Sequence, residues 1–120
     1  MSVLVAVTDS AEGRAALEAA ANEADTLNVQ LTVVNLTGSD LDLTSIATEV
    51  PYEVVVPKAG GDVDEVEQVL AAIEERPEVT RLVVGVRKRS PIGKVVLGSI
   101  PQRLMIDAPV PVLSVKATDA

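Results

Sequence analysis

One segment of the chain combines basic side chains with glycines and a serine, which are groups that can hold an anion. Between Val79 and Ile106 there is no Asp or Glu, although the chain has 18 acidic residues in all. The segment contains six basic residues, namely Arg81, Arg87, Lys88, Arg89, Lys94 and Arg103. Ser99 stands at the expected start of a helix, where unpaired backbone amides and the helix dipole favour negative charge. We therefore expect a small phosphate-bearing ligand here; the alternative is a solvated basic face that balances an acidic one.

Two glycines in this segment stand where backbone amides could approach a phosphate closely. Gly85 lies at the exit of an expected strand, and Gly98 lies at the entrance of an expected helix. Two common phosphate motifs are absent, however. Gly93 and Lys94 are followed by Val95 rather than by the Ser or Thr of a Walker A loop. The turn after the first strand has one glycine, so it lacks the dinucleotide fingerprint.

Composition excludes several classes of function. The chain has no Cys and no His, which excludes disulfides, thiolate or imidazole metal ligands and Ser-His-Asp triads. Tyr52 is the single aromatic residue, and the net charge of −8 would repel nucleic acid and anionic lipid. No apolar run approaches the ~18 residues needed to cross a bilayer, and the N-terminus lacks a basic signal region. We expect a soluble cytoplasmic protein that forms one domain over residues 1–120.

Short runs of β-branched apolar residues alternate with helical patterns along the chain. Strands are expected at 3–7, 29–36, 52–56, 79–86 and 110–115, helices at 11–27, 62–76 and 99–107, and a basic loop at 87–97. Capping boxes beginning at Asp9, Asp62 and Ser99 would start the three helices. This alternation predicts an α/β fold with a parallel sheet and helices on both faces. Ligands of such folds bind at the carboxyl ends of strands where the winding direction reverses.

The sequence Gly85-Val86-Arg87-Lys88, followed by nine residues and then Gly98-Ser99, resembles the universal stress protein signature Gly-x2-Gly-x9-Gly-Ser/Thr. The Val-rich opening strand, the Ala-rich first helix and the closing segment 108–113 agree with it, so the resemblance covers essentially the whole chain. It implies a Rossmann-like, open five-stranded sheet in the order 3-2-1-4-5. It also implies a homodimer through the last strand (110–116) and, in one subgroup, ATP in the cleft.

The resemblance also implies which residues would meet the nucleotide. The phosphates would face the Gly85 amide and the backbone of Gly98, Ser99 and Ile100, within the basic segment that holds Arg87. Adenine and ribose would be framed by Ala6, Val7, Thr8 and Leu36.

Two positions depart from the signature. Lys88 replaces its second glycine, so that its side chain either fills part of the phosphate pocket or brings an ammonium group to the phosphates. Thr8 aligns with the usual acid at the end of the first strand, and Asp9 lies one residue later.

The expected function is binding of ATP or a related adenine nucleotide by a stress-response sensor or interaction module. The expected phosphate loop has no acid to hold Mg²⁺, and Asp9 alone is near enough, so we expect at most weak ATPase activity. The alternative is a nucleotide-free dimeric interaction protein whose cleft is empty or takes another anion. In either case the last strand is apolar on both faces and would leave an unpaired edge, which predicts pairing with a second copy.

Overall fold

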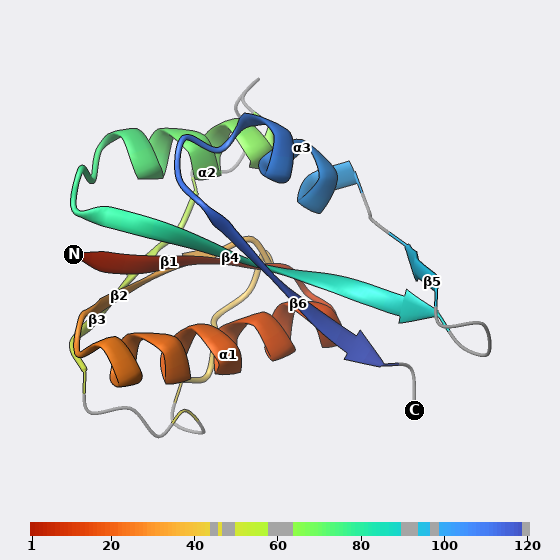
Figure 1. Cartoon of the computed structure of the whole chain (residues 1–120), viewed down its shortest axis with the longest axis horizontal. Coiled ribbons are helices and arrows are strands. Elements are labelled where there is room, and N and C mark those ends of the chain that lie inside the picture. The colour runs from red at the N-terminus through yellow and green to blue at the C-terminus, as the bar shows by residue number, and fades with distance from the viewer. Residues whose placement is uncertain (44–45, 47–49, 58–63, 90–93, 97–98, 119–120) are drawn as a thin grey trace.

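The computed structural model describes residues 1–43, 46, 50–57, 64–89, 94–96 and 99–118, and its elements follow the expected alternation (Figure 1). The strands are β1 (Ser2–Val7), β2 (Gln30–Asn35), β3 (Tyr52–Val55), β4 (Val79–Arg89), β5 (Lys94–Val96) and β6 (Val112–Thr118). The helices are α1 (Ala11–Leu27), α2 (Glu65–Glu74) and α3 (Ser99–Asp107). None of the described helices is long and apolar enough to cross a membrane.

A parallel sheet forms the centre of the molecule. β1 pairs in parallel with β2 on one side and with β4 on the other, β3 pairs with β2, and β6 pairs with β4. The parallel strands therefore lie in the order β3-β2-β1-β4-β6. Because β6 is the fifth parallel strand along the chain, this is the expected order 3-2-1-4-5, and the expected fold class is confirmed.

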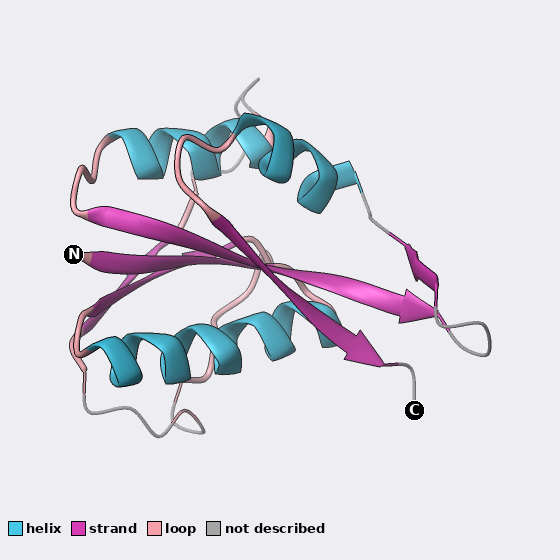
Figure 2. Ribbon diagram, viewed as in Figure 1, coloured by secondary structure: helices cyan, strands magenta, loops and turns pink. Residues whose placement is uncertain are grey.

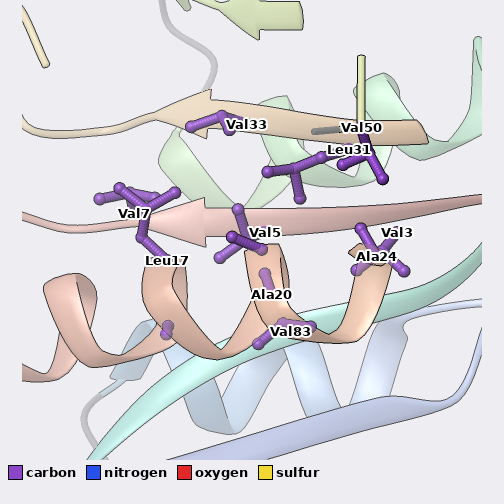
Figure 3. Close-up of a cluster of buried hydrophobic side chains, with 12 residues drawn as sticks. Val3, Val5, Val7, Leu17, Ala20, Ala24, Leu31, Val33, Val50 and Val83 are labelled. Carbon is purple, nitrogen blue, oxygen red and sulfur yellow. The ribbon is translucent and has the colours of Figure 1, made fainter. Parts of the chain in front are cut away.

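Helices cover both faces of this sheet, with α1 on one face and α2 and α3 on the other (Figure 2). Every residue of β1 is buried, because alternate side chains enter two different cores. Val3, Val5 and Val7 pack with the Ala-rich face of α1 (Figure 3), whereas Leu4 and Ala6 belong to the core under α2 and α3. The continuous apolar run of the first strand is therefore explained by burial on both faces.

The caps of the first two helices lie close to, but not at, the expected residues. Ser10, rather than Asp9, caps α1, and its Oγ accepts a hydrogen bond from Gly13 N at 3.0 Å. Asp64 caps α2 by accepting from Glu67 N at 2.8 Å, while the expected cap Asp62 lies outside the described residues. Several Ser and Asp side chains stand before each helix, and only the backbone path decides which one reaches the free amides.

The expectation of a basic loop over 87–97 is wrong. β4 continues to Arg89, and Lys94–Val96 pairs with Arg87–Arg89 as the antiparallel strand β5. β1 ends at Val7, so one edge of β4 has no parallel neighbour beyond that point, and β5 pairs there while β6 occupies the opposite edge. The sequence did not indicate this strand, because its residues and those of its partner are largely basic. The pairing forms through backbone groups and therefore requires no apolar run.

Two glycines allow the first turn of α1 to rest directly on the sheet. A Cβ at Gly13 would overlap the carbonyl oxygen of Thr8 at the end of β1, and a Cβ at Gly85 would overlap the carbonyl oxygen of Glu12 in α1. Both obstacles are backbone atoms, which cannot rotate away as the tip of a side chain could. These contacts hold the start of α1 against the carboxyl ends of β1 and β4.

We predict that Gly85→Ala lowers the free energy of unfolding by about 3 kcal/mol, since the new methyl group must push α1 away from β4. Gly38→Asn is the matched control. A Cβ there meets nothing within 4 Å, and Asn tolerates the left-handed conformation at φ +78. Urea unfolding of both variants measures the difference; equal stability of the two would contradict the close contact.

Candidate functional site

A cavity of about 260 Å³ opens at the carboxyl ends of β1 and β4. From β1 the chain enters α1 on one face of the sheet, whereas after β4 it reaches α3 on the other face (Figure 1). The cavity thus lies where the winding direction reverses, which is where open α/β sheets bind ligands. Its walls are formed by Thr8, Ser10 and Glu12 near the start of α1, by Gly85, Val86 and Arg87 of β4, and by Ser99, Ile100 and Pro101 of α3.

The wall on the side of α1 is polar and held by its own hydrogen bonds. Thr8 Oγ1 and Ser10 Oγ lie 2.8 Å apart, and Ser10 Oγ also accepts the Gly13 amide. Ser10 N donates to the Thr8 carbonyl at 2.9 Å, so the turn between β1 and α1 is closed by backbone as well. These hydroxyls therefore keep fixed positions and present oxygen atoms to the cavity.

One acidic and one basic side chain face each other in the cavity. Glu12 Oε2 lies 3.8 Å from Arg87 Nε, and this oxygen is buried without a hydrogen bond from any residue that the structure describes. Arg87 comes from β4, where backbone pairing with β5 and β6 fixes its position. The charges of the pair offset each other, so the cavity is less positive than the basic sequence segment suggested.

The wall on the side of α3 is the first turn of a nine-residue helix. Ser99 is exposed, Ile100 and Pro101 are partly buried, and free amides of this turn carry the partial positive charge of the helix end. Proline has no amide hydrogen, so Pro101 supplies no donor, and the amides of Ser99 and Ile100 are the donors that this turn offers. This end of the cavity favours an anion.

The structure brings five of the expected site residues to this one cavity: Thr8, Gly85, Arg87, Ser99 and Ile100. Ala6 is buried in the core, and Leu36 packs against that core on the same face of the sheet. Gly98 and the side chain of Lys88 lie outside the described residues, although the backbone of Lys88 pairs with Val95 and Thr118.

Four residues that line the cavity are not among those predicted from the sequence to contact the ligand: Ser10, Glu12, Val86 and Pro101. Glu12 matters most among them because it is charged. The sequence suggested it only as a capping partner of Asp9, and no motif marks it. Gly13 and Gly85 are the sequence features that could have indicated the position of Glu12. Glycine at these two positions permits the start of α1, which includes Glu12, to approach β1 and β4 closely.

Asp9 and Val7 line a second cavity of about 340 Å³, between α1 and the residues after β2. Thr8 is shared by both cavities. The turn after β2 is shaped by Asn35, whose Oδ1 accepts from Thr37 N at 3.0 Å and whose Nδ2 donates to the Ser39 carbonyl at 2.7 Å. Across the described residues, no group of three or more Asp or Glu side chains could hold a metal ion.

A third, open cavity joins α2 to α3 and shares Ser99 and Ile100 with the first. On its rim Arg103 Nη1 donates to Asp64 Oδ2 at 2.7 Å. The hydrogen bond from the Glu67 amide, and after it the one from Arg103, holds the pKa of the Asp64 carboxyl below its ordinary value. This ion pair connects the start of α2 to the middle of α3 on that face.

The chain is similar to universal stress proteins in sequence and in structure. Residues 47–116 match the model of the universal stress protein family. A universal stress protein of Mycolicibacterium smegmatis is 36% identical, over 87% of this chain and 88% of that protein. A universal stress protein structure from Archaeoglobus fulgidus is 26% identical with a TM-score of 0.71, covering 97% of this chain and 98% of that one.

A further structure from Archaeoglobus fulgidus shares the fold at 18% identity. It is a universal stress protein in complex with dAMP, with a TM-score of 0.63 over 97% of this chain and 98% of that chain.

We predict that Arg103→Gln raises the pKa of Asp64 part of the way toward its ordinary value, because the Glu67 amide remains. The lowered pKa means that Asp64 stabilises the fold above its pKa in the unfolded chain. This contribution is lost as the pH falls through its pKa in the folded chain. An NMR titration of the Asp64 carboxyl measures the shift, with Arg81→Gln as a control outside this pair. A return of the Asp64 pKa to its ordinary value in Arg103→Gln would show that the Glu67 amide is not the main cause of the lowered pKa.

Proposed function

This chain belongs to the universal stress protein family, and we propose that its cleft binds ATP or a related adenine nucleotide. The domain would then act in the cytoplasm as a stress-response sensor or interaction module. The observation that carries the proposal is the cavity at the switch point of the sheet, which gathers Thr8, Gly85, Arg87 and Ser99. The complex of a related fold with dAMP supports an adenine nucleotide as the ligand class.

The phosphates would lie against the start of α3, where the amides of Ser99 and Ile100 and the Ser99 hydroxyl can donate hydrogen bonds. The Arg87 guanidinium is the cation of the described cavity that can pair with a phosphate. Gly98 and the ammonium group of Lys88 would complete this end. Ala6, Val7, Thr8 and Leu36 would frame the adenosine from the carboxyl ends of β1 and β2.

The same residues do not favour efficient hydrolysis of the nucleotide. Mg²⁺ would be carried mainly by the phosphates, because Asp9 lines the neighbouring cavity and Glu12, the carboxylate in the described lining of this one, faces Arg87. No histidine exists in the chain to act as a base, and Glu12 lies beside Arg87. We therefore propose a binding module with at most weak ATPase activity.

A second candidate is a cleft that stays empty of nucleotide or takes a smaller anion. The size of the cavity favours it, because about 260 Å³ is below the ~300–1,000 Å³ usual for ligand pockets. Mass spectrometry of gently purified, then denatured protein separates the two candidates, since a bound adenine nucleotide would co-purify.

We predict that Ser99→Asp weakens ATP binding at least about tenfold and leaves adenosine binding unchanged. An acidic residue at the start of α3 suits the helix dipole, so the free protein should remain as stable as wild type. Its charge would stand where the phosphates are proposed to lie. Ser99→Asn is the neutral control and should bind ATP nearly as the wild type does. Calorimetry with ATP and adenosine measures both affinities.

Thermal unfolding provides the direct test of binding. ATP at a hundredfold excess over its Kd should stabilise the wild type by about 2.7 kcal/mol, or about 10 °C for a domain of this size. No shift of the wild type with either ATP or AMP at millimolar concentration and low salt would refute nucleotide binding.

We also propose a homodimer formed through β6. In the described part of the sheet β6 pairs with β4 alone, so its other edge leaves backbone groups for a partner strand. Leu113 is 39% exposed on this strand. Antiparallel pairing of two β6 strands about a two-fold axis would cover both the open edge of β6 and the Leu113 side chain.

We predict that Leu113→Lys converts the dimer to the 12.5 kDa monomer without unfolding it, since two added charges would meet across the axis. Val54→Lys is the matched control, because Val54 is 40% exposed on β3 at the opposite edge of the described sheet. Sedimentation at micromolar concentration distinguishes the species. A wild-type monomer, or dissociation by Val54→Lys instead, would be incompatible with pairing through β6.

A further inference from the structure

Two similar ion pairs connect α1 to β4, one at each end of their contact. Glu23 pairs with Arg81 near the start of β4, and Glu12 pairs with Arg87 near its end. The acidic side chains are 26% and 23% exposed, and the basic ones 39% and 48%. The two pairs therefore share their elements, their charge and their degree of burial, and they differ in what surrounds them.

The pair at the end of β4 lies in the cavity and is the more open of the two. Arg81 Nη1 donates a hydrogen bond to Glu23, whereas Glu12 Oε2 and Arg87 Nε are 3.8 Å apart, too far for one. Glu12 Oε2 is nevertheless buried and accepts no hydrogen bond within the described part of the chain. A buried oxygen of this kind is uncommon in folded proteins and calls for a reason.

The backbone holds Glu12 at this place. Gly85 packs against the Glu12 main chain, and Gly13 packs against the end of β1, so the first turn of α1 cannot withdraw from the cavity without losing both contacts. The carboxylate therefore remains close to any ligand that enters. An ionised carboxylate accepts hydrogen bonds and repels other anions, which makes it a poor neighbour for phosphate oxygens and a good one for sugar hydroxyls.

We propose that Glu12 is a specificity-determining residue that limits the number of phosphate charges the cleft accepts, so that adenosine monophosphate is preferred to ATP. The phosphate of the ligand occupies the end formed by α3, and the sugar hydroxyls lie toward Glu12. Between the two nucleotides, a cavity of about 260 Å³ suits AMP better than the larger ATP. This inference rests on the proposed nucleotide site.

The test is a series of ligands that differ in phosphate number. Affinities for adenosine, AMP, ADP and ATP are measured by calorimetry at low salt without divalent cations. The proteins are wild type, Glu12→Gln, Glu12→Asp and Glu23→Gln, each first checked for its melting temperature. Glu23→Gln changes the net charge as Glu12→Gln does and breaks the equivalent ion pair, but away from the cavity.

The wild type should bind AMP at least as tightly as ATP. Glu12→Gln should raise the affinity for ATP relative to AMP by about tenfold, because ATP carries more charge near the removed carboxylate. Adenosine should bind equally well to both. Glu12→Asp, which keeps the charge, should keep the preference of the wild type, as should Glu23→Gln.

An unchanged ratio in Glu12→Gln, or an equal change in Glu23→Gln, would overturn the inference. A parallel series with phosphate, pyrophosphate and tripolyphosphate separates this failure from failure of the nucleotide proposal. If Glu12→Gln favours longer inorganic anions while no adenine compound binds any variant, Glu12 selects charge in an anion cleft and the nucleotide proposal is wrong. If neither the adenine compounds nor the inorganic anions bind to any of the proteins, both proposals fail.

Discussion

The first turn of α1 lies so close to the ends of β1 and β4 that this contact determines both how the helix packs on the sheet and where the cavity forms. Gly13 and Gly85 leave no room for a side chain between the helix and the sheet. With that approach fixed, the Ala-rich face of α1 meets the valines of β1 at short range and buries them completely. The same contact sets the near wall of the cavity, so stability and the site share one origin.

Gly85 belongs to the resembled signature, and its surroundings give it a structural reason beyond any ligand. A glycine at this point of β4 is required by the Glu12 backbone, even with nothing bound. A signature glycine therefore need not report on phosphate binding by itself. The residues that would bear on the proposed ligand are the ones whose polar side chains line the cavity, namely Thr8, Ser10, Glu12, Arg87 and Ser99.

Most strands were easier to predict from the sequence than the helix caps and the residues of the cavity, for a physical reason. β1, β2 and the middle of β4 (82–86) are buried on both faces, so each needs a continuous run of apolar, mostly β-branched residues, and such a run is recognised in the sequence. β5 is stabilised by backbone pairing to β4 and carries no such run. The caps shifted by one or two residues because local patterns do not fix where the chain turns. Glu12 was missed because its place follows from a contact with Gly85, which is 73 positions away in the sequence.

The basic segment from Val79 to Ile106 illustrates how far charge counting can mislead. Three of its six basic residues face carboxylates from the helices, since Arg81 pairs with Glu23, Arg87 with Glu12 and Arg103 with Asp64. The sequence separates these charges by 39 to 75 positions, and the fold brings them together. These three tertiary contacts offset half of the positive charge of the segment. Among the described residues, attraction of an anion would then depend on the amides at the start of α3 and on how Arg87 divides its charge between Glu12 and a ligand. An anion that carries little charge can share Arg87 with Glu12, whereas a highly charged one must also meet the repulsion of that carboxylate.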